Sequence, residues 1–225
     1  MSHTFSLVDS LALDDLHTFL SRAGRIEEGS VRLIAGSGVL AAYVAVLYPV
    51  GLRDESPTVL GLRTFALTDE ATFDAVVPLR SLIERLVRLQ GIERDQSEPV
   101  TVGLPIEVNT ATWAAISPPR GGWLQLEPTE PRMLETVAKS GIDEIKEAVP
   151  DEIGEQILRR VRSEVWSRPI EGLEHVPAGA AFAAMTLGFL ATDEPVTIYE
   201  TGPWTRLTSL GGHTLVRRKS WTLLH

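Results

Sequence analysis

The sequence predicts an α+β protein, with a mainly antiparallel sheet and packed helices in its first half. The second half is expected to be a helical region that ends in a β-hairpin. Three observations lead to this prediction. Apolar residues alternate or run continuously through much of 25–126, whereas their spacing in 130–191 is helical. Glycine turns at Gly36 and Gly38, and at Gly211 and Gly212, join successive strands, which favours antiparallel pairing.

The amino-terminal residues are expected to form a helix over 12–23, because Leu13, Leu16 and Leu20 recur at helical spacing and Gly24 follows as a terminating residue. Three strands should follow, over residues 31–35, 39–48 and 58–67. Both alternating faces of the 39–48 segment are apolar. We therefore expect that strand to be central in its sheet.

The rest of the first half is predicted to contain one helix and three more strands. Pro78 suits the first position of the helix, since its missing N–H is not needed there. Alternation of apolar residues predicts a strand over 100–108. Two short strands, 113–116 and 123–126, should flank the loop between them.

The second half is expected to begin after residue 126, where a Pro/Glu run ends the β-rich part. The chain would then divide into 1–126 and 127–225, or form one continuous domain. Helices are predicted from Pro131, with an interruption at Ser140 and Gly141, and again after Asp151. The uncharged segment 178–191 is rich in small residues, so it is either a core helix or a subunit contact. Strands are expected over 196–200, 204–209 and 213–219.

The composition excludes several classes of chemistry. The 225 residues include no cysteine, so disulfides, thiolate metal sites and thiol nucleophiles are ruled out. The net charge of −9 opposes binding to nucleic acid and to anionic membranes. The amino terminus lacks a basic signal region and the apolar runs are too short to span a bilayer, so we expect a cytoplasmic protein. An arginine-rich, lysine-poor composition is typical of GC-rich bacterial genomes.

No local motif indicates a metal or a cofactor. The five histidines never occur at the spacings of metal ligands, and the best cluster, Asp14, Asp15 and His17, does not share one helix face. Gly36, Ser37 and Gly38 lack the flanking glycines of a nucleophile elbow or a phosphate loop. They are better explained as a hairpin turn.

Two loops carry the candidate ligand-binding residues. In the first, Arg120 could hold a carboxylate or phosphate while Trp123 supplies a flat apolar wall. In the second, Trp204 is followed by Arg206 and His213 on the predicted hairpin. The competing interpretation for both loops, which the sequence alone favours, is a turn whose arginine forms a structural ion pair.

The hairpin is also locally basic, with Arg217, Arg218 and Lys219, which raises the alternative of a DNA-binding winged helix. The preceding segment, 178–191, argues against this, because it offers almost no donors or cations to bases and phosphates. Nucleic acid is therefore an unfavoured partner.

These observations lead to two functional hypotheses. The first is a non-enzymatic binding, assembly or regulatory protein that forms a homodimer and holds a small anionic ligand near Arg120. The second is an enzyme acting on a small anionic metabolite, with Arg120 or Arg206 holding the anion and His213 or His175 as acid and base. The absence of a recognisable catalytic motif favours the first hypothesis.

Overall fold

The computed structural model describes residues 3–50, 54, 56–108, 110–148, 154–190 and 193–218. The chain forms two compact units. Unit 1 comprises Met1–Ala45 and Leu62–Ser117, and unit 2 comprises Val46–Gly61 and Pro118–His225. Helices and antiparallel sheets occur in both, as the α+β prediction requires.

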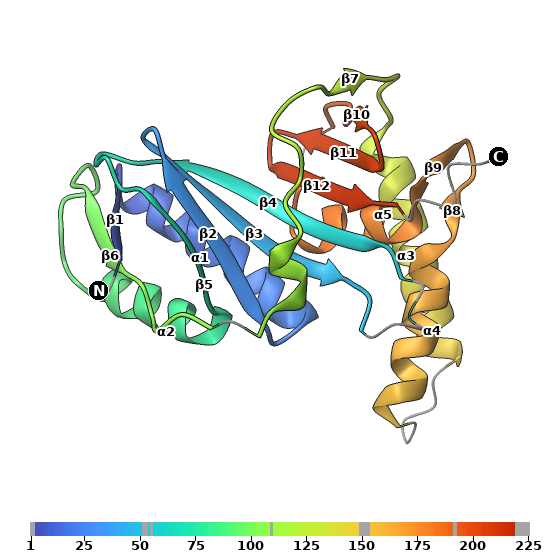
Figure 1. The fold of residues 1–225 in the computed structure, drawn as a ribbon, viewed down its shortest axis with the longest axis horizontal. Helices are drawn as coiled ribbons and strands as arrows, with labels where there is room; N and C mark the ends of the chain where they lie inside the picture. Colours follow the sequence, from blue (N-terminus) through green and yellow to red (C-terminus); the bar gives the residue numbers. More distant parts are fainter. Residues whose placement is uncertain are drawn as a thin grey trace. The chain divides into compact units, whose positions relative to one another are not determined.

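Unit 1 is built on the strand order β5-β2-β3-β4, in which β2 pairs antiparallel with both β5 and β3 (Figure 1). The elements of this sheet are β2 (Ser30–Gly36), β3 (Val39–Leu47), β4 (Thr58–Ala66) and β5 (Phe73–Pro78). A separate antiparallel pair joins β1 (Thr4–Leu7) to β6 (Val100–Gly103). Unit 1 also contains two α-helices, α1 (Ser10–Ile26) and α2 (Leu79–Gln90), and the 3-10 helix η1 (Thr112–Ala115).

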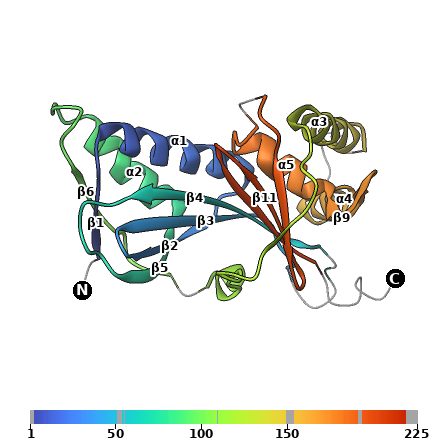
Figure 2. The same ribbon diagram turned by 90° about the horizontal axis from the view of Figure 1, so that it is seen from above.

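Both helices of unit 1 cover the same face of its sheet (Figure 2). The strands turn every second side chain toward that face, so that Val31, Leu33 and Ala35 of β2 are buried while the intervening residues are half-exposed. Leu13, Leu16 and Leu20 of α1 are also fully buried. Asp9 caps α1, its carboxylate accepting from the N–H of Ala12 at 2.7 Å.

Unit 2 has the strand order β4-β12-β11-β10-β7, to which β4 contributes Thr58–Gly61. Its strands are β7 (Leu124–Gln125), β10 (Thr197–Thr201), β11 (Trp204–Ser209) and β12 (Gly212–Arg217), with β8 (Pro169–Ile170) and β9 (Leu173–Pro177) as a second antiparallel pair. The helices are α3 (Pro131–Ala148), α4 (Glu155–Ser167) and α5 (Ala178–Thr186). Helix α5 contacts β12 on one side and α3 and α4 on the other.

The uncharged segment is therefore a core helix. Ala180, Ala181 and Ala183 are fully buried in unit 2, and Gly179 brings α5 against the backbone of α4, since a Cβ there would lie 3.0 Å from the carbonyl oxygen of Trp166. Small side chains are needed here because the helices approach closely. Of the two alternatives for this segment, the structure supports the core helix over Ala178–Thr186.

Several local predictions are confirmed. Gly36 to Gly38 form the hairpin turn, with positive φ at Ser37 (53°) and Gly38 (72°). Strand β3 is central, between β2 and β4. The carboxy-terminal strands β11 and β12 pair antiparallel from Trp204 opposite Arg217 to Ser209 opposite Gly212. Lys219, placed in the last strand by the sequence, lies outside the described residues.

Other predictions were wrong. The segment 113–116 is the 3-10 helix η1, and the strand predicted over 100–108 is only the four-residue β6. Helix α1 passes through Gly24, where an added Cβ would lie 3.7 Å from side-chain atoms of α2. Helix α3 likewise continues through Gly141, where the missing side chain makes room for the Trp166 ring. Tertiary packing thus explains both glycines, which the sequence had suggested end or interrupt a helix.

Candidate functional site

Arg206 lies in the middle of strand β11, on the sheet of unit 2. Its cross-strand partners are Tyr199 on β10 and Leu215 on β12. Residues directly opposite each other in antiparallel strands project from the same face of the sheet. The phenol ring of Tyr199 is therefore beside the Arg206 side chain, across the hairpin that β10 and β11 form.

The guanidinium of Arg206 lies over two aromatic rings. Its Cζ is 4.3 Å from the centroid of the Tyr199 ring and 4.6 Å from that of the Trp123 ring. Both distances are within the range of cation–π attraction. Trp123 directly precedes β7, which pairs with β10, so the strand order explains how a residue 83 positions earlier in the chain reaches Arg206.

The positive charge of Arg206 has no counter-charge in the described part of the chain. Its Nε is buried without a hydrogen-bond partner there, and no described carboxylate forms an ion pair with it. Burial lowers the pKa of Arg206 below its ordinary value, opposed by a smaller contribution from the nearby phenol of Tyr199. The group nevertheless stays charged at any physiological pH. A buried donor on a cation is costly to leave unsatisfied, and an anion is the kind of group that could satisfy it.

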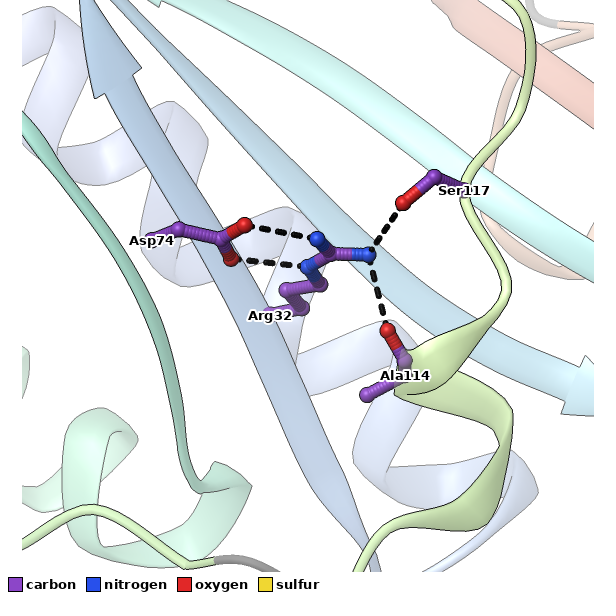
Figure 3. A network of polar contacts seen from close by, with 4 residues as sticks. All are labelled: Arg32, Asp74, Ala114 and Ser117. Carbon is purple, nitrogen blue, oxygen red and sulfur yellow. Dashed lines mark hydrogen bonds and ion pairs between the residues drawn. The ribbon is translucent and has the colours of Figure 1, made fainter.

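Arg32 in unit 1 shows the opposite arrangement (Figure 3). Its Nε and one terminal nitrogen donate to the two carboxylate oxygens of Asp74, at 2.8 and 2.6 Å. Its other terminal nitrogen donates to the carbonyl of Ala114 at 2.8 Å and to the hydroxyl of Ser117 at 3.0 Å. These contacts raise the pKa of Arg32, chiefly through the hydrogen bonds to Asp74. Arg32 is thus satisfied by its own chain and is a structural residue.

His213 lies on the same face of the hairpin as Arg206. It is the cross-strand partner of Thr208, whose hydroxyl is 3.0 Å from the ring Nδ1. Burial lowers the pKa of His213 below its ordinary value of 6.5, and repulsion from the Arg206 charge lowers it further. The imidazole is therefore neutral at pH 7 and bonded to a hydroxyl group rather than to a carboxylate.

The remaining residues proposed from sequence lie around this centre. Trp204 projects from the same face of β11 as Arg206 but is only 4% exposed. Arg120 is exposed, in the turn that precedes β7. The indole Nε1 of Trp123 donates to the carbonyl of Pro119 at 3.1 Å, which fixes that turn. The two candidate loops are thus joined through the contact between Trp123 and Arg206.

Sequence reasoning missed Tyr199 as a member of the site. It lies in a segment correctly predicted as a strand, and nothing in the local pattern distinguishes it from a packing residue. The available signal was the alternation of β10, which places Thr197, Tyr199 and Thr201 on one face, together with the antiparallel order that sets this face beside Arg206. His175, the other candidate acid or base, lies on β9 in a different sheet, and its Nε2 is buried without a partner among the described residues.

Within the part of the chain that the structure describes, no three His, Asp or Glu side chains gather as a metal site would require. None of the described helices has the length and apolar character needed to cross a membrane.

Two family models match the sequence, each covering one part of it. Residues 1–111 match a domain of unknown function (DUF8010), and residues 118–221 match another (DUF8185). The interval between the two matches includes the boundary of the compact units at Ser117 and Pro118. No curated protein matches the sequence.

Solved structures with a similar fold are bacterial sliding clamps. The DnaN clamp of Bartonella birtlesii (DNA polymerase III subunit beta), bound to griselimycin, has a TM-score of 0.52 and 10% identity, over 99% of this chain and 68% of that one. Two Caulobacter crescentus structures, described as a DNA polymerase sliding clamp and as pol III beta, have TM-scores of 0.50 and 0.51 at 12% identity. Each match covers 97% of this chain and 65% of the clamp, so this chain spans about two thirds of the clamp's length. The chain therefore has a fold similar to that of sliding clamps, and each of its parts matches a domain family of its own.

Proposed function

We propose that this protein is a cytoplasmic, non-enzymatic binding protein that holds a small anion at Arg206. The observation that carries the proposal is the unpaired guanidinium, which lies over Trp123 and Tyr199 with a buried Nε that has no partner among the described residues. The anion-holding role that the sequence suggested for Arg120 thus has its better candidate at Arg206.

The surroundings of Arg206 support binding more than catalysis. An acid or base needs a partner that stabilises its changed protonation state, and a carboxylate is the usual one for histidine. His213 instead bonds to the hydroxyl of Thr208. The similar clamps are described as subunits or sliding clamps of DNA polymerase, which supports an assembly role for this fold. The charge of −9 argues against extending the similarity to nucleic acid.

Self-association is a separate part of the proposal. With α5 buried, a homodimer would have to use other apolar side chains, such as Leu124 (68% exposed) and Leu210 (73% exposed) in unit 2. Light scattering of the purified protein at high micromolar concentration tests this expectation, and a strict monomer would contradict it.

The enzyme hypothesis keeps one supporting observation. Arg206 and His213 share a face of one hairpin, so an anion held by the first could present an atom to the neutral imidazole of the second. Turnover of a bound anion that is lost in His213→Asn but not in Thr208→Val would favour this alternative.

The anion site is tested by calorimetric titration of the wild-type protein with acetate and inorganic phosphate. Arg206→Gln removes the charge but keeps a polar side chain, so we expect it to weaken binding at least about tenfold. Arg32→Gln is the matched control, because that arginine is already paired within unit 1. Equal affinities of the wild type and Arg206→Gln would reject the proposal.

A further inference from the structure

A second arginine without an ion-pair partner among the described residues lies in the turn that holds Trp123. This turn includes Pro119, Arg120 and Gly122, and it is closed by the 3.1 Å hydrogen bond from the Trp123 indole to the Pro119 carbonyl. Gly122 has a φ of 76°, and a Cβ there would lie 3.5 Å from the Thr201 hydroxyl. The turn therefore packs against the end of β10, the strand that carries Tyr199.

The backbone of Arg120 is consequently held close to the Trp123 ring. Its Cα is about 3.8 Å from that of Pro119, whose carbonyl oxygen contacts the indole nitrogen. The side chain of Arg120, in contrast, is not fixed in this way. It is exposed and forms no ion pair with any described carboxylate. A long, flexible guanidinium on a fixed backbone can reach over the ring beside it.

Arg206 lies over the Trp123 ring, and Arg120 is three residues before Trp123 in the turn that this ring closes. Arg206 contacts both aromatic rings, whereas Arg120 has an exposed side chain with several rotatable bonds. A ligand with one anionic group needs only the Arg206 guanidinium. A ligand with two anionic groups separated by a few atoms can contact the Arg206 guanidinium with one group and the Arg120 guanidinium with the other.

Resting on the proposed function of Arg206, we propose that the site selects small anions with two separated anionic groups, and that Arg120 contacts the second group. Short dicarboxylates and pyrophosphate share this chemistry. Thr197, Thr201 and Thr208 lie on the same face of the sheet and add hydroxyl groups that suit an anionic ligand. Trp123 contributes the apolar wall between the two cations.

The test compares anions with one and two anionic groups at constant ionic strength, by calorimetric titration of the full chain. Acetate and inorganic phosphate are the first pair of probes, and succinate and pyrophosphate the second. For the wild type we expect the second pair to bind at least about tenfold more tightly than the first, since one charge-assisted contact has about that effect. Tighter succinate than pyrophosphate binding would identify the groups as carboxylates, and the reverse order would identify phosphates.

Arg120→Gln should remove this preference, because the second anionic group would then have no cation to contact. Arg217→Gln is the matched control. Arg217 is an exposed arginine on β12, opposite Trp204, in the β11–β12 hairpin that carries Arg206. A preference that survives in Arg120→Gln, or that is lost in Arg217→Gln instead, overturns the inference and leaves the Arg206 site standing. Affinities for all four anions that are unchanged in Arg206→Gln would overturn the proposed function itself.

Discussion

At the scale of single residues, two glycines in helices give opposite predictions for the same substitution. A Cβ on Gly141 of α3 would overlap the Trp166 ring, at 2.6 Å from its Cη2 and closer still to its Cζ3. This ring is 2% exposed and stacks on Phe182 with 4.4 Å between the ring centroids. The ring cannot move aside without breaking that stack. Gly141→Ala should therefore destabilise the protein by about 1–3 kcal/mol, as overpacked cores do.

Gly24 of α1 is the matched control. A Cβ added there would lie 3.7 Å from side-chain methyl groups of α2, an ordinary contact distance. Gly24→Ala should stabilise the protein by about 0.5–1 kcal/mol, because alanine loses less conformational entropy in a helix. Urea unfolding of both variants measures the two changes, and a loss of stability at position 24 would contradict this account.

A second residue-scale prediction concerns His213. Folding lowers its pKa below the ordinary 6.5, so in the pH range just below that value the unfolded chain binds a proton that the folded chain does not. The free energy of unfolding should therefore be fully retained above about pH 6.5 and decrease as the pH falls toward the lowered pKa.

His213→Asn keeps a group that can bond to Thr208 but does not titrate. We expect its melting temperature to fall less than that of the wild type between about pH 7.5 and pH 5.5. An identical slope in His213→Asn would show that His213 does not control stability in this range.

At the scale of elements, Arg32 ties η1 and the end of unit 1 to the sheet. Its side chain is 14% exposed and its four described hydrogen bonds join β2 to β5 and to the segment that ends at Ser117. Arg32→Gln should reduce the free energy of unfolding by about 1–3 kcal/mol, since hydrogen bonds to charged groups are individually strong.

Arg80→Gln provides the comparison for Arg32. Arg80 is 83% exposed and pairs with Glu84 within α2, so its removal should change stability by less than about 0.5 kcal/mol. Chemical denaturation of both variants distinguishes the two kinds of arginine. Equal effects would mean that the Arg32 network contributes no more than a surface pair.

The elements that the sequence predicted well are those with strong turn chemistry. The β2–β3 and β11–β12 hairpins follow from their glycines and apolar patterns. Strands β1, β5, β8 and β9 were missed, because they have two to six residues and depend on distant partners. Apolar residues around Trp113 suggested a strand, but burial of Trp113 and Ala114 is equally satisfied by the 3-10 turn of η1.

The site was predictable only in its parts. Trp123 and Arg206 each stood out beside a glycine or proline in a separate loop. Their contact depends on β7 pairing with β10, which no local pattern encodes. The assignment of His213 and Trp204 to ligand binding stays a prediction, as does the division of the chain after residue 126.

At the scale of the whole molecule, the two units are not consecutive in sequence. Unit 2 includes Val46–Gly61, and the first residues of β4 provide the neighbour of β12. A fragment of residues 118–225 would lack this strand, leaving the backbone groups of β12 unpaired.

We therefore expect fragment 118–225 alone to aggregate or to melt at a lower temperature than the full chain. Adding fragment 1–117 in trans should restore stability, because it carries the missing strand of the sheet. Size-exclusion chromatography with thermal denaturation checks both statements. A monomeric fragment 118–225 that melts with the full chain would contradict them.

The contact between Trp123 and Arg206 has an optical consequence. The Arg206 guanidinium lies 4.6 Å from the centroid of the Trp123 ring, so we expect an anion bound to Arg206 to change the emission of this indole. By contrast, Trp113, Trp166 and Trp204 are at most 5% exposed and lie away from the solvent. Trp123 is thus an intrinsic fluorophore at the centre of the candidate site. The wavelength of its fluorescence emission would report whether an anion occupies the site, without any added label.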